Sequence, residues 1–245
     1  MLDNARLSED TASFKRYASK EFWQAVSELI ALAYKYASAG ADFLWDMDPN
    51  LDAEANRILQ DLSDSLAEKA KAIARAVIEE SFELGDLDEA WDRDNGNAYV
   101  PIVTRLDLQG SHLKELLEIW VALAFVHHIS KSELKVLISR YLANPYASPL
   151  WKGLPQDAIK WGRGYARNVL EQMTVIGQGA IVAAVRYAEW NDARDTGADY
   201  YVRRRGSGYE CKVCQDMANK PIPIYVPFEI PHPRCMCWPE FFHNS

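Results

Sequence analysis

All four cysteines of this 245-residue chain lie in its last 35 residues, and their spacing is that of metal ligands. Cys211 and Cys214 form a Cys-x-x-Cys turn, and His232 and Cys235 repeat the same spacing before Cys237. Two such pairs are what a tetrahedral Cys₃His zinc site requires. We favour these first four residues as ligands, and Cys237 could replace Cys235 or His232. A metal with four protein ligands has no open position for water, so the predicted Zn²⁺ is structural.

The spacer between the two halves of this pattern restricts the local fold further. Residues 220–231 read Lys-Pro-Ile-Pro-Ile-Tyr-Val-Pro-Phe-Glu-Ile-Pro. Its prolines exclude a helix and limit strand pairing to the edge of a sheet. We therefore expect the metal to stabilise this segment, by on the order of 10 kcal/mol in small knuckles.

Two interpretations without a metal stay open. A pair of disulfides would need an oxidising compartment, and the N-terminal Met1-Leu-Asp-Asn-Ala-Arg lacks the basic start and apolar core of a signal peptide. The four thiols could also be free and partly buried.

Known zinc chemistries require partners that this sequence lacks. No His-x-Glu of a zinc deaminase and no His-Glu-x-x-His of a metalloprotease is present. His243-Asn244 after a Cys-x-x-Cys is loosely similar to zinc-supported nucleases, without an acidic or histidine partner beside it. We predict no catalytic residues and no other cofactor.

The rest of the chain has the apolar periodicity of helices. We expect helices over residues 11–39, from Pro49 to Gly85, over 111–128, from Ser130 to about 144, and from Pro155 to about 190. Ser130-x-x-Glu133 is a capping box. Residues 119–126 are apolar on all sides, which predicts the most deeply buried helix, or one buried between subunits.

The remaining segments read as loops and a small β module. Residues 85–110 are predicted to be an acidic loop with a short strand at 99–103, and a hairpin from Ala198 onward would carry the first cysteine pair. The predicted fold class is mainly α, a multi-helix body with a small C-terminal zinc-knuckle-like β/loop module. Its predicted parts are an N-terminal helical region (1–150), a long connecting helix (151–197) and the zinc-binding module (198–245).

Charge is distributed unevenly along the chain. Residues 200–245 hold six Lys and Arg against four Asp and Glu, whereas the whole chain carries −8. The acidic body argues against broad nucleic-acid binding. The basic run Arg203-Arg204-Arg205 is the candidate contact for DNA phosphates or an acidic partner, and a solvated turn or intrachain ion pairs is the alternative. No stretch approaches the ~18 apolar residues of a membrane span.

The ending Cys-x-x-Cys, Pro-rich spacer and Pro-His-Pro-x-Cys-x-Cys resembles the minor head proteins of tailed bacteriophages, the Mu F-like head morphogenesis family. The resemblance covers about residues 186–240 and rests on the cysteines with Pro231, His232 and Pro233. It departs at Met236, where the family has arginine, and at Gly208-Tyr209-Glu210, where the family has an Asp-led approach.

This resemblance implies a structural virion component, present in few copies near the portal inside the head and needed for head assembly. Its expected partners are portal and major capsid proteins, with packaged DNA as a candidate for the basic tail, and no membrane. Its expected location is the phage head, and the host cytoplasm during assembly. The alternatives are a zinc-supported nuclease or toxin-type enzyme, and a zinc-knuckle nucleic-acid-binding protein.

Overall fold

The computed structural model describes residues 4–38, 48–82, 91, 102–143, 169–206, 212–229 and 237–243. The chain divides into two compact units, each built from separate segments. Unit 1 consists of Met1–Arg16, Ala67–Ile102 and Thr174–Ser245, and unit 2 of Tyr17–Leu66 and Val103–Met173. The division predicted after residue 150 lies outside the described residues.

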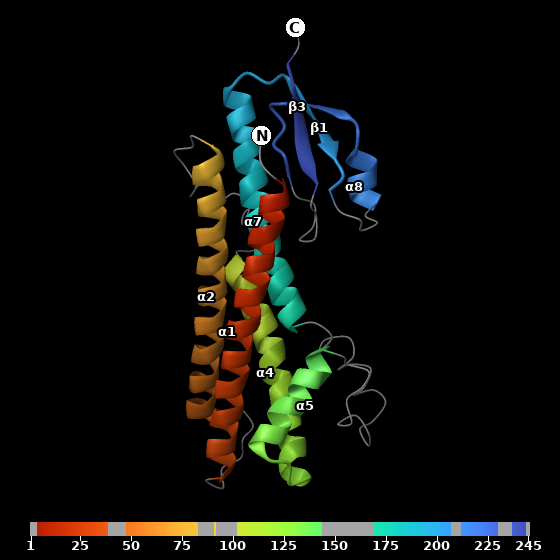
Figure 1. Cartoon of the computed structure of the whole chain (residues 1–245). Helices are drawn as coiled ribbons and strands as arrows, with labels where there is room; N and C mark the ends of the chain where they lie inside the picture. The colour runs from red at the N-terminus through yellow and green to blue at the C-terminus, as the bar shows by residue number, and fades with distance from the viewer. Residues whose placement is uncertain are drawn as a thin grey trace. The chain divides into compact units, whose positions relative to one another are not determined.

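Helices make up most of the described residues, and three short strands follow near the C-terminus (Figure 1). The helices are α1 (Asn4–Ser38), α2 (Pro49–Ser81), α4 (Ile102–Val126), α5 (Lys131–Ala143), α7 (Val169–Asp195) and α8 (Lys212–Met217). The strands are β1 (Tyr200–Arg204), β2 (Pro221–Pro223) and β3 (Trp238–Phe242). The predicted fold class, a mainly helical chain with a small C-terminal β module, is confirmed. No helix within the described ranges is long and apolar enough to cross a membrane.

Two helices start with caps that their sequences encode. Pro49 occupies the first turn of α2, and the Asp48 carboxylate accepts hydrogen bonds from the backbone N–H groups of Asn50 at 2.9 Å and Leu51 at 3.3 Å. The capping box of α5 is confirmed, because the Ser130 N–H donates to the Glu133 carboxylate at 3.0 Å. The Glu133 N–H is 3.4 Å from the Ser130 hydroxyl.

The structure corrects two predictions about the middle of the chain. Residues 102–110 are the start of α4 rather than loop or strand, and residues 92–101 lie outside the described residues. Helix α4 is also not buried on all sides, because Ile119 is 36% and Val126 72% exposed. Among the described residues, the completely buried stretch is instead residues 179–190 of α7. Because this stretch contains the charged residues Arg186 and Glu189, its sequence did not indicate complete burial.

The core of unit 1 depends on a close approach between α1 and α7. Gly177 lies against the ring of Phe14, which is itself fully buried. The Gln178 side chain donates to the Thr11 carbonyl at 2.8 Å beside this contact. Gly177 is therefore a position of close packing between α1 and α7.

In unit 2, tyrosine hydroxyls connect segments that are distant in sequence. The Tyr34 hydroxyl donates to the Ile129 carbonyl at 2.7 Å, and Tyr17 and Ser65 hydroxyls lie 2.7 Å apart. The Lys114 ammonium pairs with Asp52. Apolar side chains of α1, α2 and α4 fill the interior, among them Phe22, Val26, Leu29, Leu59, Leu62 and Trp120.

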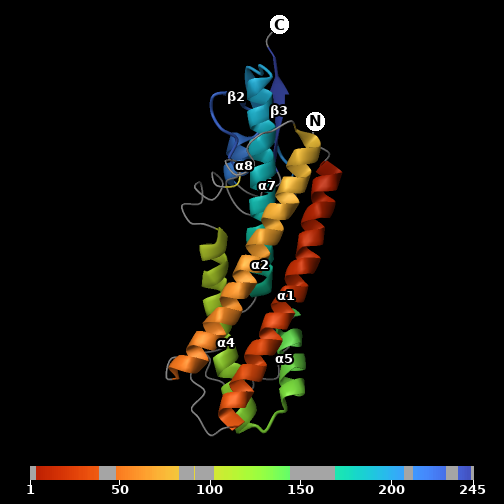
Figure 2. The same ribbon diagram turned by 90° about the vertical axis from the view of Figure 1, so that its left-hand side faces the viewer.

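The three strands form one antiparallel sheet in the order β2-β1-β3. Strand β2, which contains Pro221 and Pro223, is an edge strand as predicted, because proline has no N–H to donate to a second neighbour. Figures 1 and 2 both show the sheet beside the C-terminal end of α7. Strands β1 and β2 are consecutive antiparallel partners, and the connection between them contains a six-residue helix, α8, which carries Cys214.

Candidate metal centre

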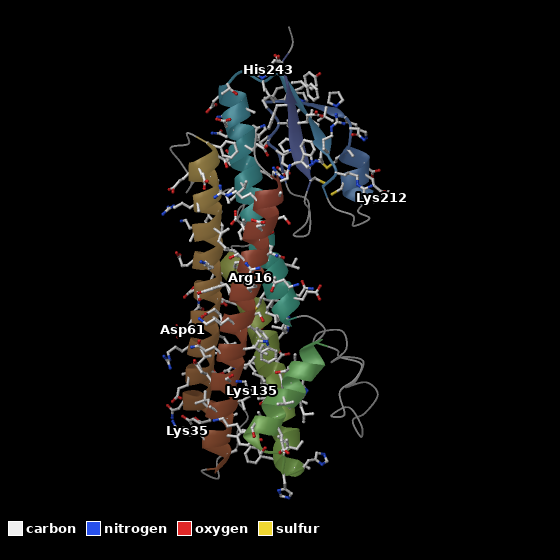
Figure 3. All side chains as sticks on the ribbon, in the orientation of Figure 1. Arg16, Lys35, Asp61, Lys135, Lys212 and His243 are labelled. Carbon is white, nitrogen blue, oxygen red and sulfur yellow. The ribbon has the colours of Figure 1, made fainter. Side chains whose placement is uncertain are left out.

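The sheet, α7 and α8 enclose one buried aromatic cluster. We call it the cysteine cluster, and its members are Tyr187, Trp190, Tyr201, Cys214, Phe228 and Cys237. Ile222, Ile224 and Phe241 pack against it and are partly buried. Sulfur atoms lie beside α8 in Figure 3.

Hydrogen bonds hold the proline-rich spacer onto this cluster. The Trp190 indole N–H donates to the Ile224 carbonyl at 2.9 Å. The Tyr201 hydroxyl donates to the Pro227 carbonyl at 3.2 Å. These two bonds satisfy backbone carbonyls of a segment that makes few strand contacts, and so fix its course across the cluster.

Two of the five candidate ligands lie within the described residues, and both are in the cysteine cluster. Cys214 comes from α8 and is 1% exposed, and Cys237 precedes β3 and is 0% exposed. The two halves of the cysteine pattern are thus brought into one buried place. Cys211, His232 and Cys235 lie outside the described residues. Among the described residues, no three His, Cys, Asp or Glu side chains gather as a metal site.

The basic run Arg203-Arg204-Arg205 is divided by the alternation of β1. The Arg203 side chain is buried at 0% exposure, and its guanidinium lies 4.1 Å from the ring centre of Phe228. Arg204 binds the Glu240 carboxylate at 2.6 Å on the opposite face of the sheet. Arg205 is the exposed member of the run.

Burial also acts on the tyrosine next to Arg203. Burial raises the pKa of Tyr201 to about 12, against the lowering effect of the Arg203 charge, and the Glu229 charge adds to the rise. The Tyr201 hydroxyl therefore stays protonated and keeps its hydrogen bond at neutral pH.

His243, the residue of the nuclease alternative, lies at the end of β3 and is exposed. Its Nδ1 is 3.0 Å from the Gly197 carbonyl. In Figure 3 it stands at the opposite end of the β module from Lys212, where α8 begins.

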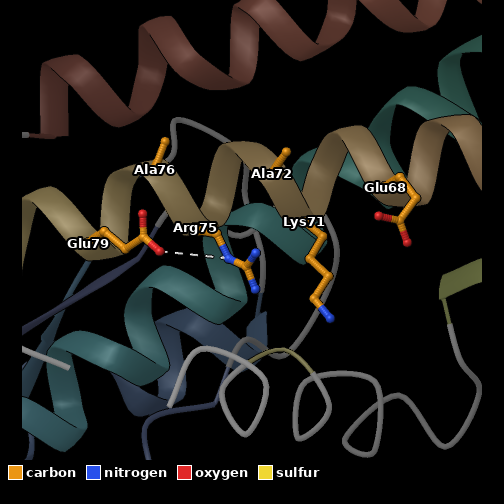
Figure 4. Close-up of a pocket in the computed structure, with 6 residues that line it drawn as sticks. All are labelled: Glu68, Lys71, Ala72, Arg75, Ala76 and Glu79. Atoms are coloured by element: carbon orange, nitrogen blue, oxygen red, sulfur yellow. Dashed lines mark ion pairs between the residues drawn. The ribbon is translucent and has the colours of Figure 1, made fainter. Parts of the chain in front are cut away.

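Two cavities lined by described residues lie on helix surfaces, one in each unit. One, of ≈ 310 Å³, follows an exposed face of α2 in unit 1, and its lining includes an Arg75–Glu79 ion pair of 3.8 Å (Figure 4). In unit 2, a cavity of ≈ 570 Å³ surrounds the α4–α5 turn with His127, His128 and Glu133. The Glu133 carboxylate there is the partner of Ser130 in the helix cap.

The two buried thiols of the cysteine cluster are compatible with a metal ligand set that includes further residues. Thiolate sulfur is a preferred ligand of Zn²⁺, and a dry aromatic surround suits a closed structural site. The buried Arg203 also has Nε and Nη1 groups without hydrogen-bond partners, as expected beside a centre that would bring negative charge. The burial of Arg203 was not predicted, although its two-residue spacing from Tyr201 was the available signal.

Comparisons with family models, with curated proteins and with solved structures find no match to this chain. The fold and the cysteine cluster therefore define its class by themselves: a mainly helical protein with a small, cysteine-bearing β module.

Proposed function

We propose that this protein is a structural minor head protein of a tailed bacteriophage, and that Zn²⁺ holds its C-terminal module together. The observation that carries the proposal is the burial of Cys214 and Cys237 in one cluster, 23 residues apart in sequence. This burial agrees with a closed metal site, whose ligands come from both halves of the pattern that resembles the phage family. The role of such a site is to stabilise the fold, since a saturated metal offers no position for substrate.

The proposed metal ligands are four of Cys211, Cys214, His232, Cys235 and Cys237. Cys237 is buried in the same cluster as Cys214, and this supports Cys237 as a metal ligand more strongly than its sequence spacing does. Zinc bound there would supply a fixed junction between α8 and the start of β3.

The helical body is the proposed contact surface for portal and major capsid proteins during head assembly. Exposed apolar side chains on α4 and α5, at Leu108, Ile119, Val126 and Val136, support such contacts in unit 2. In the C-terminal module, Arg205 is the proposed contact for packaged DNA or an acidic partner.

Metal analysis of the purified protein tests the zinc site. We expect about one zinc per chain, and loss of zinc together with protease sensitivity of the module in Cys214→Ser. The Met217→Ser variant, on the same short helix, is the matched control and is expected to retain zinc. Comparing Cys235→Ser with Cys237→Ser identifies the fourth ligand. A metal-free protein with a protease-resistant module would overturn the site.

The assembly role has its own test. The protein should be present in purified phage heads, and heads should fail to assemble when the chain is absent. Normal, infectious heads without the chain would reject the role even if zinc were bound. DNA cleavage that disappears in His243→Ala would support the nuclease alternative instead.

A further inference from the structure

Arg203 is a fully buried cation whose hydrogen-bonding capacity is mostly unused. Its Nη2 donates to the Glu229 carbonyl at 2.6 Å, and its guanidinium lies over the ring of Phe228. Its Nε and Nη1 groups are buried and have no hydrogen-bond partner. Burying a guanidinium is unfavourable unless an opposite charge and hydrogen-bond acceptors compensate for the lost water.

The described carboxylates do not supply this opposite charge. None of the ion pairs among the described residues includes Arg203, and Glu240, on the neighbouring strand, pairs with Arg204. A phosphate or an acidic side chain of another molecule is also excluded as the partner, because Arg203 is 0% exposed. An opposite charge inside the module would compensate for the burial of this guanidinium.

The geometry of the sheet directs Arg203 toward the cysteine cluster. Tyr201 and Arg203 are two residues apart on β1, so both side chains lie on the face that holds Tyr201 in that cluster. The register partner of Arg203 is Pro239, and Cys237 comes two residues before Pro239 in the approach to β3. Residues in such diagonal positions have side chains within reach of an arginine. Phe228, beneath the guanidinium, belongs to the same cluster as Cys214 and Cys237.

A zinc–thiolate centre has the charge that Arg203 lacks. Zn²⁺ with three thiolates and one imidazole carries a net charge of about −1, and with four thiolates about −2. We propose that Arg203 is the buried counter-charge of this centre. The inference rests on the proposed zinc site. Arg203 would then be a positioning and charge-balancing residue rather than a ligand. The arginine run would have two roles: Arg203 balances the charge of the metal centre, and Arg205 contacts an external partner.

Zinc competition with a chromophoric chelator, on the full-length protein, tests the inference. Arg203→Met should lower zinc affinity about ten- to a hundredfold, the usual cost of losing a group that supports metal ligands. Arg204→Met removes the same charge one residue further along, on the opposite face, and should change zinc affinity by less than about threefold. Arg203→Lys keeps the charge and should retain most of the affinity.

A second measurement separates charge balance from ordinary packing. In chelator-treated protein, Arg203→Met removes a buried charge without a counter-charge, so the metal-free module should resist protease at least as well as wild type. If Arg203 only packed the module, the variant would be more sensitive both with and without zinc.

The outcomes are distinct. Wild-type protein without zinc would reject the zinc site, and with it the role of Arg203. Zinc-loaded wild type with an unchanged affinity in Arg203→Met would reject the role of Arg203 alone. If Arg203→Met does not fold even with zinc, Arg203→Lys decides, since a large loss of affinity in that charge-retaining variant would overturn the inference.

Discussion

The ring of Phe14 on α1 lies so close to Gly177 on α7 that a single methyl group at position 177 would overlap it. The contact is in the core of unit 1, where Phe14 is fully buried and its ring is surrounded by other side chains. A close approach of this kind is possible only where one helix has no side chain. The packing of α1 against α7 at this point therefore requires a large side chain at position 14 and no side chain at position 177.

Gly177→Ala should consequently destabilise the protein by about 1–3 kcal/mol, the usual cost of overpacking a core. Gly110 on α4 is the matched control, because a methyl group there would meet Leu59 at an ordinary distance of 3.5 Å. Gly110→Ala should be neutral or stabilising by up to about 1 kcal/mol, since alanine favours the helix. Urea unfolding followed by circular dichroism measures both. Equal effects of the two substitutions would refute the contact.

Helices α4 and α7 end with the same backbone turn but with different residues in it. His128 and Gly197 have positive φ angles of 54° and 87°, and the residue after each donates a hydrogen bond to a carbonyl five residues earlier. A side chain in this conformation costs about 1 kcal/mol, and glycine avoids that cost.

Gly197→Ala should therefore lower the free energy of unfolding by about 1 kcal/mol, although nothing lies within 4 Å of the added methyl group. His128→Gly should raise it by about 0.5 kcal/mol. Thermal unfolding of the two variants checks the opposite signs. A stabilising Gly197→Ala would show that the turn does not constrain the backbone.

The capping box of α5 predicts a pH effect as well as a stability effect. Hydrogen bonds from the Ser130 hydroxyl and backbone N–H lower the pKa of the Glu133 carboxyl below its ordinary value of 4.5. Because the folded pKa is lowered, this stabilisation is present at neutral pH and is lost as the pH falls through the folded value.

Ser130→Ala should cost about 1 kcal/mol at pH 7 and should make acid unfolding less dependent on Glu133. Ser139→Ala, on the same helix but outside its first turn, is the control and should leave both unchanged, because the Ser139 hydroxyl donates to the Lys135 carbonyl and not to the cap. Unfolding free energies measured between pH 3 and pH 7 decide, and an identical acid profile in Ser130→Ala would contradict the cap.

The sequence predicted helices and caps better than it predicted burial. Period-3.6 patterns located α1 and α2, because each has a polar face opposite its apolar face, and the capping box located α5. Helix α7 was found but not recognised as the most buried, since Arg186 and Glu189 neutralise each other inside it. The start of α4 was missed because polar residues from 85 onward obscured the first turns.

The cysteine cluster was predictable from spacing, but its surroundings were not. Metal-ligand spacing is local in sequence, so it indicated Cys214 directly and Cys237 only as a substitute for Cys235 or His232. The burial of Arg203 depends on pairing between β1 and β3, which are more than 30 residues apart. The only sign of such a long-range contact in the sequence is the alternation of inward and outward side chains along the strand. Three consecutive arginines suggested a solvated surface instead.

The buried Arg186–Glu189 ion pair on α7 should contribute far more to stability than the exposed Arg194–Asp195 pair on the same helix. Arg186 is 1% exposed, and its guanidinium binds the Glu189 carboxylate at 2.7 Å. Glu189→Gln leaves that guanidinium buried without its counter-charge and should cost about 3–5 kcal/mol. Asp195→Asn, which breaks the exposed Arg194–Asp195 pair of 3.0 Å, should cost no more than about 1 kcal/mol.

A double substitution separates charge from packing at the buried pair. Arg186→Met with Glu189→Leu should be less destabilising than Glu189→Gln alone, because no charge is left buried. Urea unfolding of the three variants gives the comparison. A double variant less stable than Glu189→Gln would mean that packing around Arg186, rather than its charge, dominates.

Tyr201 predicts an alkaline limit to the stability of the C-terminal module. Its pKa is about 12 in the folded protein, mainly through burial, compared with an ordinary value of 10.0. Because the folded pKa is the higher one, folding favours the protonated phenol. That contribution is fully present below pH 10 and is lost as the pH rises through about 12.

Tyr201→Phe should remove this alkaline dependence, while costing about 1 kcal/mol at neutral pH for the lost hydrogen bond to the Pro227 carbonyl. Tyr225→Phe is the control, because its ring is 78% exposed and its hydration differs little between the folded and unfolded states. Protease resistance of the module, measured from pH 7 to pH 12, should fall steeply above pH 10 in wild type and in Tyr225→Phe. In Tyr201→Phe the fall should be shallower. If the three proteins lose resistance at the same pH, ionisation of Tyr201 does not control unfolding of the module, and the aromatic side of the cysteine cluster is more accessible to water than its burial indicates.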